Sequence, residues 1–358
     1  MIVVLGAGYA GLMVANALGR KADVRLVNER DTFVERVRLH QLAAGQELVR
    51  RPLAKLLRGV GLEVGRVVAL DPAARTVGLA DGREVGYDTL VYALGSSGDL
   101  STPGAAEHAY DVGVPADAAR LRDRLAGGGT VAVVGGGLTG IETAAELARP
   151  DLKVVLLTDR LGAGLSEKGR AHVAAVFARL GVEVREGVAV ERVRADGVEL
   201  ASGDHVTADA VAWTAGFRVP DLARDAGIEV DAAGRMVVDE TLRSVSHPDV
   251  YGVGDAAAAR MPGGQELRMA CATGLPSAQH AARAILARRA GREPGALRFR
   301  YFNQCISLGR TDALIQFVDR DDTPRERILT GRLAVAYKEA IVRGVVVAER
   351  HPWIPTMI

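Results

Sequence analysis

The residues of this sequence whose types and spacing could support chemistry lie in two glycine-rich turns. The first is GAGYAG at residues 6–11, and the second is GGGLTG at residues 135–140. Each turn follows a short apolar run and precedes a stretch with the apolar spacing of a helix. A helix that begins directly after a strand presents unpaired N–H groups and the positive end of its dipole, which favour a phosphate. The pattern therefore predicts a dinucleotide pyrophosphate at each turn, and two dinucleotides in one chain.

The three glycines of each turn are expected to serve different purposes. In the first turn Gly6 permits the tight bend, Gly8 lets the backbone approach a phosphate, and Gly11 lets the helix pack on the strand. One such motif alone is weak support, but here both copies lie within a strand–helix–strand pattern. The expected strands are residues 2–5, 24–27, 131–134 and 154–157, and the expected helices are residues 12–18 and 141–148.

An acidic residue about 20 positions after the glycine turn usually binds the ribose of a dinucleotide. In the first copy Asn28 and Glu29 occupy this place, and Glu29 is the favoured partner of the ribose hydroxyls. In the second copy the place holds Asp159 and Arg160. Asp159 suits the free 2′-hydroxyl of NADH, whereas Arg160 suits the 2′-phosphate of NADPH, and both alternatives stay open.

The segment after each strand–helix–strand unit also repeats. Turn signals at residues 71–72 and 81–82 in the first half, and at 196–197 and 203–204 in the second, predict small antiparallel sheets. Each module then ends on a buried strand that runs into a glycine, the first over residues 89–94 before Gly95 and the second before Gly216. The chain continues with VYGVGDAA, a helical stretch over residues 276–290 and a C-terminal segment.

Five motifs along residues 1–290 resemble, in the correct order, the two-dinucleotide-binding-domain flavoproteins of the pyridine nucleotide–disulfide reductase superfamily. VLGAGYAGL is similar to their FAD fingerprint, and VVGGGLTGIETAAEL is similar to their NAD(P)H fingerprint. TLVYALGS and AVAWTAGF resemble the crossover motifs between the two domains, and VYGVGDAAA resembles the second FAD motif. The likeness is greatest to the disulfide-free members, the type II NADH dehydrogenases and the apoptosis-inducing-factor-like oxidoreductases.

The resemblance implies an α/β fold with two Rossmann-like dinucleotide-binding domains and a small C-terminal α+β segment. The FAD-binding domain is expected to be discontinuous, with the NAD(P)H-binding domain inserted into it. The expected boundaries are residues 1–112 and 231–297 for the FAD-binding domain, 113–230 for the NAD(P)H-binding domain, and 298–358 for the C-terminal segment, as an interface or acceptor site.

The resemblance also assigns FAD to the first glycine turn and NAD(P)H to the second. Asp255, in the second FAD motif, is expected to accept hydrogen bonds from the ribityl chain of the flavin, and its simpler alternative role is a helix N-cap. The loop FVERVRLHQLAAG is expected beside the FAD pyrophosphate. The residues expected to bind the two cofactors are Gly6, Gly8, Tyr9, Ala10, Gly11, Asn28, Glu29, Arg38, Val67, Ala93, Gly95, Gly135, Gly137, Leu138, Thr139, Asp159, Arg160, Ala215, Gly216, Gly254, Asp255 and Ala256.

Glu142 is the candidate catalytic residue, and two interpretations of it stay open. It follows Gly140 by two positions, so it is expected in the first turn of the nucleotide-binding helix, where the helix dipole favours a carboxylate by roughly 0.3–1 kcal/mol. In the enzymes that this sequence resembles, the glutamate at this position faces the flavin and the nicotinamide. The resemblance therefore implies a proton carrier or a residue that positions the nicotinamide.

Three features depart from the pattern of the superfamily. The Cys-x4-Cys pair of the disulfide reductases is absent, so a dithiol relay is not expected. Cys271 follows the second FAD motif, where approach to the flavin ring is one alternative, but the preferred interpretation of Cys271 and Cys305 is that of small buried hydrophobic residues. Their spacing matches no metal signature, and no metal site is expected. The quinone-site pattern of type II dehydrogenases is present at Ala278 and Gln279, but Arg283 replaces its second glutamine, which argues against quinone reduction.

The C-terminal segment is expected to contain one helix, because apolar residues between 333 and 344 have helical spacing. The following Val345, Val346 and Val347 favour a strand. Membrane-attached members of the superfamily end in amphipathic helices, which carry basic residues around a broad apolar face. The charges here are mixed, so a docked core helix or a homodimer contact is preferred over peripheral membrane contact.

Composition limits the class of protein. The 358 residues include 45 Lys and Arg and 44 Asp and Glu, a formal net charge of +1, so nothing favours nucleic acid as a partner. The sequence shows no signal peptide and no transmembrane segment, and a cytoplasmic location is expected. The predicted activity is hydride transfer from NAD(P)H to FAD and then electron transfer to a small-molecule acceptor such as a quinone. The alternatives are a flavoprotein that modifies one specific metabolite, and an NAD(P)H-binding redox sensor.

Overall fold

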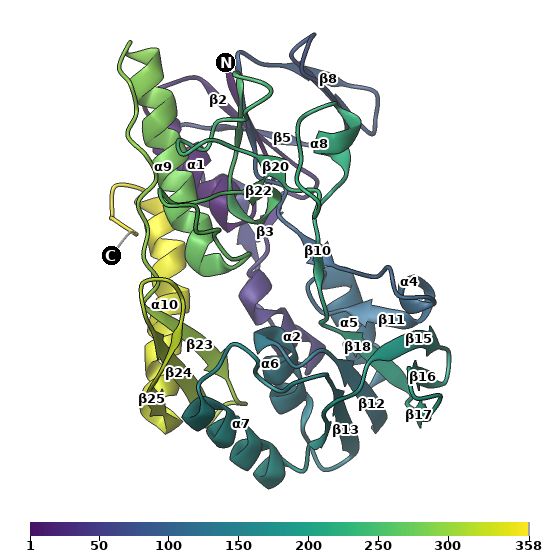
Figure 1. The fold of residues 1–358 in the computed structure, drawn as a ribbon. Coiled ribbons are helices and arrows are strands. Elements are labelled where there is room, and N and C mark those ends of the chain that lie inside the picture. The colour runs from purple at the N-terminus through teal and green to yellow at the C-terminus, as the bar shows by residue number, and fades with distance from the viewer. Residues whose placement is uncertain (357–358) are drawn as a thin grey trace.

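The computed structural model describes residues 1–356 and contains two five-stranded parallel sheets. The first sheet has the strand order β21–β9–β1–β2–β5 and lies in the upper lobe of Figure 1. Its elements are β1 (Ile2–Leu5), β2 (Val24–Asn28), β5 (Gly61–Val64), β9 (Thr89–Tyr92) and β21 (Val250–Gly252), with α1 (Tyr9–Leu18) crossing between β1 and β2. Strand β1 is apolar and buried along its whole length, as expected at the centre of a parallel sheet.

The second sheet repeats this design in the lower lobe, with the order β11–β18–β12–β13–β14. Its elements are β11 (Ala109–Asp111), β12 (Gly129–Val134), β13 (Leu152–Leu157), β14 (Glu183–Arg185) and β18 (Ala210–Trp213), with the helices α5 (Pro115–Arg124), α6 (Leu138–Leu147) and α7 (Glu167–Leu180). In both sheets the strand before the glycine turn is central, with β1 between β9 and β2 and β12 between β18 and β13. The predicted α/β fold with two Rossmann-like units is confirmed.

The chain returns to the first sheet after it has built the second. Strand β21 pairs in parallel with β9, with Val250 opposite Leu90. A short antiparallel pair, Ser97 with Arg218 and Gly98 with Phe217, joins the two connections between the lobes. The strand order supports the proposed division into a discontinuous first domain and an inserted second one.

Both predicted antiparallel extensions are present. The first consists of β6 (Val67–Asp71), β7 (Thr76–Leu79) and β8 (Glu84–Gly86), and the second of β15 (Val190–Arg194), β16 (Gly197–Leu200) and β17 (His205–Thr207). The shorter elements are β3 (Thr32–Phe33), η1 (Arg36–Arg38), α2 (Leu39–Ala43), β4 (Arg51–Pro52), α3 (Leu53–Leu56), β10 (Ser97–Gly98), α4 (Ala105–His108), β19 (Phe217–Arg218), α8 (Leu222–Asp225), β20 (Met236–Val237), η2 (Gly254–Ala256) and β22 (Ala257–Ala258).

The C-terminal part consists of two long helices and a three-stranded antiparallel sheet. Its elements are α9 (Cys271–Arg289), β23 (Asn303–Ser307), β24 (Ala313–Val318), β25 (Pro324–Thr330) and α10 (Gly331–Arg350). The predicted strand at residues 345–347 is wrong, because these valines continue α10. Val346 is buried in the same core as α1, so tertiary packing outweighs the local preference of β-branched residues for strands.

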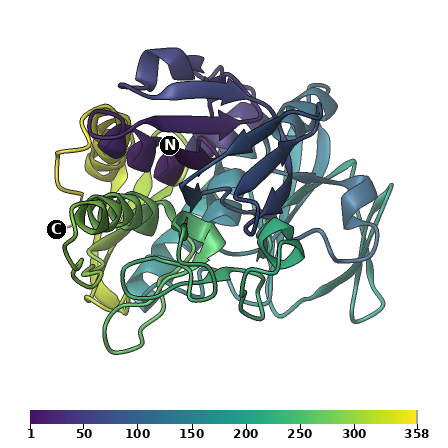
Figure 2. The ribbon, with the colours of Figure 1, turned by 90° about the horizontal axis from the view of Figure 1, so that it is seen from above.

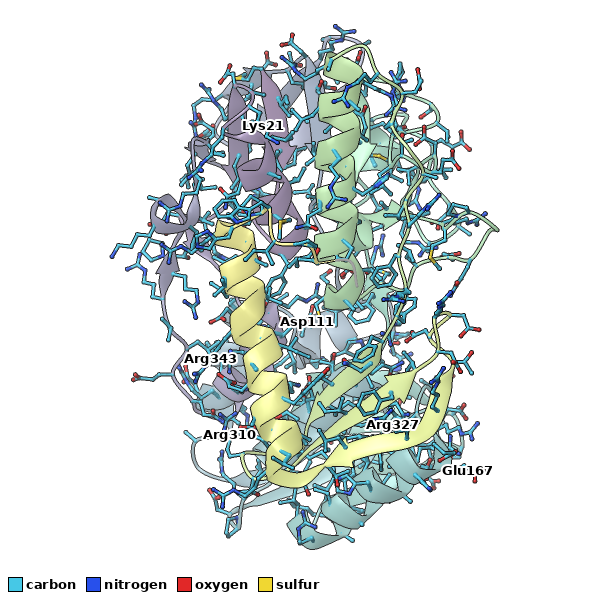
Figure 3. All side chains as sticks on the ribbon, turned by 90° about the vertical axis from the view of Figure 1, so that its left-hand side faces the viewer. Lys21, Asp111, Glu167, Arg310, Arg327 and Arg343 are labelled. Atoms are coloured by element: carbon cyan, nitrogen blue, oxygen red, sulfur yellow. The ribbon has the colours of Figure 1, made fainter. Side chains whose placement is uncertain are left out.

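Helix α10 spans both lobes. It packs on β24 and β25 at its beginning and on α1 towards its end, beside α9 (Figure 3). Helix α9 also packs against α1, so the two C-terminal helices lie on the same side of the upper lobe (Figure 2). Within the described residues, no helix is both apolar enough and long enough to span a bilayer.

Asp312 attaches the beginning of α10 to the lower lobe. Its Oδ1 accepts a hydrogen bond of 2.8 Å from the backbone N–H of Gly331, and the carboxylate pairs with Arg179 at 3.0 Å and His172 at 3.2 Å. Burial alone would raise the pKa of Asp312, but the hydrogen bond from Gly331 and the pairs with Arg179 and His172 lower it below its ordinary value.

We predict that Asp312→Ala lowers the free energy of unfolding by about 3 kcal/mol at pH 7, because it removes a buried carboxylate from its contacts with Arg179, His172 and the N–H of Gly331. The folded-state pKa lies below the unfolded-state value, so the stabilisation is present above pH ~4 and is lost as the pH falls through the folded-state pKa. Urea unfolding at neutral and acidic pH checks this, with Asp123→Ala on the exposed surface of α5 as control. A difference from the wild type that persists unchanged in acid would contradict the assignment.

Candidate active site

One cavity of about 1410 Å³ lies between the lobes and is lined by both glycine turns. The predicted site residues that line it are Gly6, Gly8, Tyr9, Ala10, Asn28, Glu29, Val67, Ala93, Gly95, Gly135, Gly137, Leu138, Thr139, Glu142, Ala215, Gly216, Gly254 and Asp255. The predicted residues outside this lining are Gly11, Arg38, Asp159, Arg160 and Ala256. Residues that are far apart in the sequence are thus brought together at one cleft.

The glycines of the two turns show where a ligand has room. A Cβ atom added at Gly8 or Gly137 would meet no atom within 4 Å, so the backbone at these positions is open to an approaching phosphate. A Cβ atom added at Gly11 or Gly140 would lie 1.8 Å from the carbonyl oxygen of the first glycine of its turn. The third glycine is therefore required by helix packing, and the second leaves a space that fits a pyrophosphate at each turn.

Asn28 and Glu29, at the end of β2, have different roles. The side-chain oxygen of Asn28 accepts a hydrogen bond of 2.9 Å from the backbone N–H of Ala7, and its amide nitrogen donates to the carbonyl of Arg30 at 2.8 Å. Asn28 is thus occupied in holding the glycine turn. The carboxylate of Glu29 is 57% exposed in the cavity, where it is open to ribose hydroxyls.

The end of β13 is arranged differently. Asp159 and Arg160 are exposed and do not line the cavity, and the hydroxyl of Thr158 donates to the carbonyl of Arg160 at 3.2 Å. Both alternatives therefore stay open, with Asp159 suited to NADH and Arg160 suited to NADPH.

Asp255 lies at the cavity wall and is held by two side chains. Its Oδ2 accepts a hydrogen bond of 2.7 Å from the Ser96 hydroxyl, and the Arg36 guanidinium lies 3.8 Å away. The interpretation as an N-cap is wrong, because η2 is capped by Val253 and α9 by Ala270, without a side-chain hydrogen bond at either. The carboxylate of Asp255 is thus held at the cavity wall by its neighbours and does not start a helix.

The beginning of α9 and both cysteines also face the cavity. Cys271 is exposed there, so its prediction as a small buried residue is wrong. Cys305 is half-buried, and its thiol donates to the side-chain oxygen of Asn303 at 3.2 Å. Burial raises the pKa of Cys305 to about 12, so it is a thiol, not a thiolate, at neutral pH. Within residues 1–356, no three His, Cys, Asp or Glu side chains are grouped to hold a metal ion.

Gln279, the residue of the predicted quinone-site pattern, is buried and does not line the cavity. Its amide nitrogen donates to the carbonyls of Pro352 at 3.0 Å and Ile354 at 2.6 Å, and its oxygen accepts from the backbone N–H and the hydroxyl of Thr356. The C-terminal tail thus provides hydrogen-bond partners for both the nitrogen and the oxygen of the Gln279 side-chain amide.

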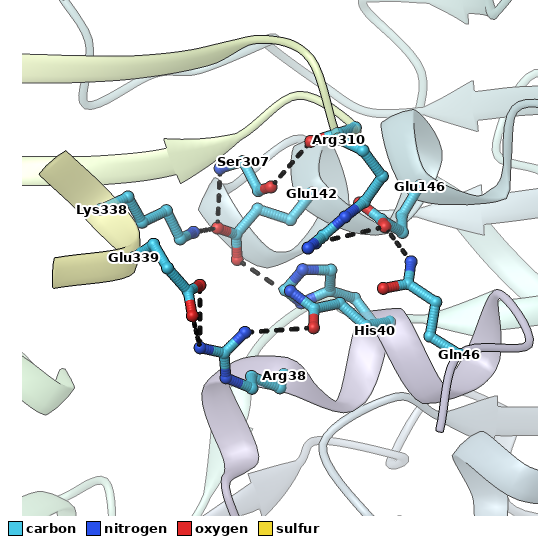
Figure 4. A network of polar contacts seen from close by, with 11 residues as sticks. Arg38, His40, Gln46, Glu142, Glu146, Ser307, Arg310, Lys338 and Glu339 are labelled. Carbon is cyan, nitrogen blue, oxygen red and sulfur yellow. Dashed lines mark hydrogen bonds and ion pairs between the residues drawn. The ribbon is translucent and has the colours of Figure 1, made fainter. Parts of the chain in front are cut away.

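Glu142 lies in a cluster of charged side chains at the cavity (Figure 4). Helix α6 begins at Leu138, so Glu142 lies beyond the first turn, and its interpretation as a dipole-stabilising acid there is wrong. Its Oε1 accepts a hydrogen bond of 2.9 Å from the backbone N–H of Ser307 and a second from the ammonium of Lys338. The carboxylate is therefore fixed by β23 and α10, which come much later in the chain.

Lys338 and Arg38 connect this cluster to α10. Lys338 lines the cavity with only 13% of its side chain exposed, and burial lowers its pKa to about 7. Arg38, which was expected beside a pyrophosphate, instead donates to both carboxylate oxygens of Glu339, at 2.8 and 2.9 Å. Nothing in the sequence marks Lys338 as a site residue, because only the packing of α10 brings it to Glu142.

We predict that Gly8→Ala keeps the fold but loses most of its FAD, because the new methyl group has room in the protein but occupies the space of a phosphate. Gly11→Ala should instead destabilise the protein with or without cofactor, since its methyl group would overlap the carbonyl of Gly6. Thermal unfolding and the ratio of flavin to protein absorbance separate the two effects. Full flavin content in Gly8→Ala would show that no phosphate lies at this turn.

Comparison with known proteins agrees with this geometry. The model of the pyridine nucleotide-disulphide oxidoreductase family matches residues 1–284. An NADH dehydrogenase-like protein of Mycobacterium tuberculosis is 34% identical over 348 residues, covering 87% of this chain and 86% of that protein. A demethylphylloquinone reductase of Synechocystis is 26% identical, covering 94% of this chain and 91% of that protein. The structure of NDH2 from Plasmodium falciparum in complex with NADH shares the fold, with a TM-score of 0.83 at 15% identity over 100% of this chain and 99% of that one. The chain belongs to the pyridine nucleotide-disulphide oxidoreductase family, as an oxidoreductase that works with FAD and a nicotinamide nucleotide.

Proposed function

We propose that this protein transfers a hydride from NAD(P)H to FAD and then passes the electrons to a quinone. The observation that carries the proposal is the single cavity lined by both glycine turns, since two dinucleotides bound at these turns share one cleft. The names of two relatives, an NADH dehydrogenase-like protein and a demethylphylloquinone reductase, support the same direction of electron flow.

The residues of the upper lobe would hold FAD. Gly8 leaves room for the pyrophosphate, Glu29 is available to the ribose, and the oriented carboxylate of Asp255 is available to the ribityl chain. The N-terminus of α9, at Cys271, faces the same cavity and favours negative charge on the ring. FAD, when bound, supplies the two-electron chemistry between the nicotinamide and the acceptor.

The residues of the lower lobe would hold and orient NAD(P)H. Gly137 leaves room for its pyrophosphate, and Glu142 projects from the following helix into the cavity. Because Ser307 and Lys338 fix the carboxylate of Glu142, it can position the nicotinamide without moving. Orientation of this kind contributes several kcal/mol to a hydride transfer, and a misplacement of about 1 Å costs on the order of 10²-fold in rate.

Helix α10 would provide the quinone site. Ile341, Val342 and Val345 line the cavity beside Lys338 and form an apolar wall suited to a quinone ring. Reduction of a quinone to a quinol takes two protons, of which the hydride supplies one. With a pKa of about 7, Lys338 can hold and release the other at neutral pH. In this assignment the quinone binds at α10 and not at Gln279. The argument against quinone reduction, which came from Arg283 in the Gln279 pattern, therefore no longer applies.

We further propose that the exposed side of α10 contacts an anionic membrane surface, where quinones are dissolved, from the cytoplasm, where NAD(P)H is available. Leu333 and Val347 are exposed on this side, at 73% and 50%, and the tail exposes Trp353. The exposed charged residues of α10 are all basic, namely Arg332, Arg343 and Arg350. A second copy of this face would bring like charges together, so the arrangement favours anionic lipid over a homodimer.

The function is tested by anaerobic stopped-flow spectroscopy. NADH or NADPH should bleach the flavin absorbance, and a short-chain quinone should restore it faster than oxygen does. Glu142→Gln should keep the FAD and slow the bleaching on the order of 10-fold or more, because the nicotinamide is less well placed. Glu167→Gln, at the exposed beginning of α7, is the matched control. Flavin that bleaches but is not reoxidised by any quinone would reject the quinone as acceptor, and an unchanged rate in Glu142→Gln would reject the role of this residue.

The membrane proposal is tested by sedimentation with vesicles. The protein should bind vesicles that contain phosphatidylglycerol more than vesicles of phosphatidylcholine, and added salt should weaken the binding. Val347→Glu should reduce binding, whereas Val68→Glu, which is exposed on β6, should not. No binding to either vesicle, together with a dimer in analytical ultracentrifugation that Val347→Glu dissociates, would instead identify this face as a homodimer contact.

A further inference from the structure

His40 is a buried titratable side chain for which the proposed reaction has so far no use. It lies on α2, lines the cavity and is 2% exposed, and its Nδ1 is 3.9 Å from Oε2 of Glu142. Its Nε2 has no hydrogen-bond partner among the residues that the structure describes. An unsatisfied buried polar atom costs about 1–3 kcal/mol, so a polar ring at this place calls for a reason beyond packing.

Charged groups from η1, α6, α10 and the turn between β23 and β24 surround the ring (Figure 4). They are Lys338 and Glu339 from α10, Arg38 from η1, Glu142 and Glu146 from α6, and Arg310 from the turn between β23 and β24. Burial, followed by the positive charges of Lys338, Arg310 and Arg38, holds the pKa of His40 well below its usual 6.5. Burial and these charges thus both favour the neutral ring, and the Lys338 charge is one of the contributions.

The protonation states of Lys338 and His40 depend on each other. Among the charges that keep His40 neutral, that of Lys338 has the largest effect. When Lys338 gives up its proton, this charge disappears and Glu142 loses its ammonium partner. Both changes favour a proton on Nδ1 of His40, on the other side of the same carboxylate. One proton can therefore be held on either side of Glu142.

We propose that His40 is a positioning residue that returns a proton through Glu142 to Lys338, after Lys338 has protonated the reduced quinone. The inference rests on the proposed function, in which NAD(P)H, one proton and a quinone give NAD(P)⁺ and a quinol. The hydride supplies two electrons and one proton, and Lys338 Nζ supplies the second proton to a quinone oxygen. His40 takes up a proton from water at Nε2 and releases one from Nδ1, as the two nitrogens of an imidazole permit.

The position of His40 suits proton supply while the cavity is filled. Two dinucleotides and a quinone would exclude water from the face of Lys338. We place the entry of the proton on the side of Arg310, because this charged neighbour of His40 has 56% of its side chain exposed to solvent. The proton path therefore begins away from the substrates and ends at them.

The coupling is tested without turnover, by NMR titration of protein labelled with ¹⁵N-histidine and loaded with FAD. The His40 signal is assigned by its loss in His40→Asn. Its midpoint should lie well below 6.5 in the wild type, rise by one pH unit or more in Lys338→Met, stay low in Lys338→Arg and fall in Glu142→Gln. Lys21→Met, at the far end of the molecule (Figure 3), should leave it unchanged. Lys338→Gln serves if Lys338→Met does not fold. An equal midpoint in the wild type and the uncharged variant overturns the proposal.

The kinetic consequence is tested in the two half-reactions separately. His40→Asn should bleach with NAD(P)H at the wild-type rate and keep its FAD. Its reoxidation by quinone should slow roughly 10- to 100-fold at pH 8 and less at pH 6, where protons are plentiful. A wild-type pH profile of reoxidation in His40→Asn overturns the relay. Failure of the wild type to reduce any quinone would instead overturn the proposed function, while the NMR titration would still decide whether His40 and Lys338 share a proton.

Discussion

The close approach of a helix to the turn that precedes it, made once in each lobe, is the constraint on which the rest of the structure depends. At Gly11 and at Gly140 the helix backbone passes so near the carbonyl of the first glycine that no side chain fits between them. This contact points the open end of each helix at the cavity rather than into the core. Because the same constraint acts in both lobes, the two glycine turns line one and the same cleft.

The turns themselves require an unusual backbone only where they bend. Gly6 and Gly135 have φ angles of 94° and 113°, in a region that side chains disfavour, so the bend is specified by residue type and not by the surroundings. Local chemistry of this kind can be recognised in a sequence. The two parallel sheets, the antiparallel extensions and the part of the cavity lining that the two glycine turns contribute were accordingly predictable from motifs a few residues long.

Long-range packing accounts for what the sequence did not reveal. Lys338 reaches Glu142 across 196 positions, and nothing near either residue indicates the contact. Val346 lies in a run of valines that by itself favours a strand. In the structure it is part of α10, and its side chain is buried in the same core as α1. Cys271 was expected in the core because cysteine usually is buried, but the beginning of α9 faces the cavity. Each of these errors concerns the C-terminal part, whose helices acquire their environment from elements formed earlier in the chain.

The return of β21 to the first sheet has a consequence for how the chain folds. The inserted lobe has all five strands of its sheet once residue 213 is present, whereas the first sheet lacks its edge strand until residues 250–252 arrive. Contacts between residues this far apart form slowly, and a lobe whose strands are contiguous is able to collapse first. On a ribosome, the N-terminal lobe would thus begin as an open four-stranded sheet with an unprotected edge at β9, and it would be completed around an insert that is already folded.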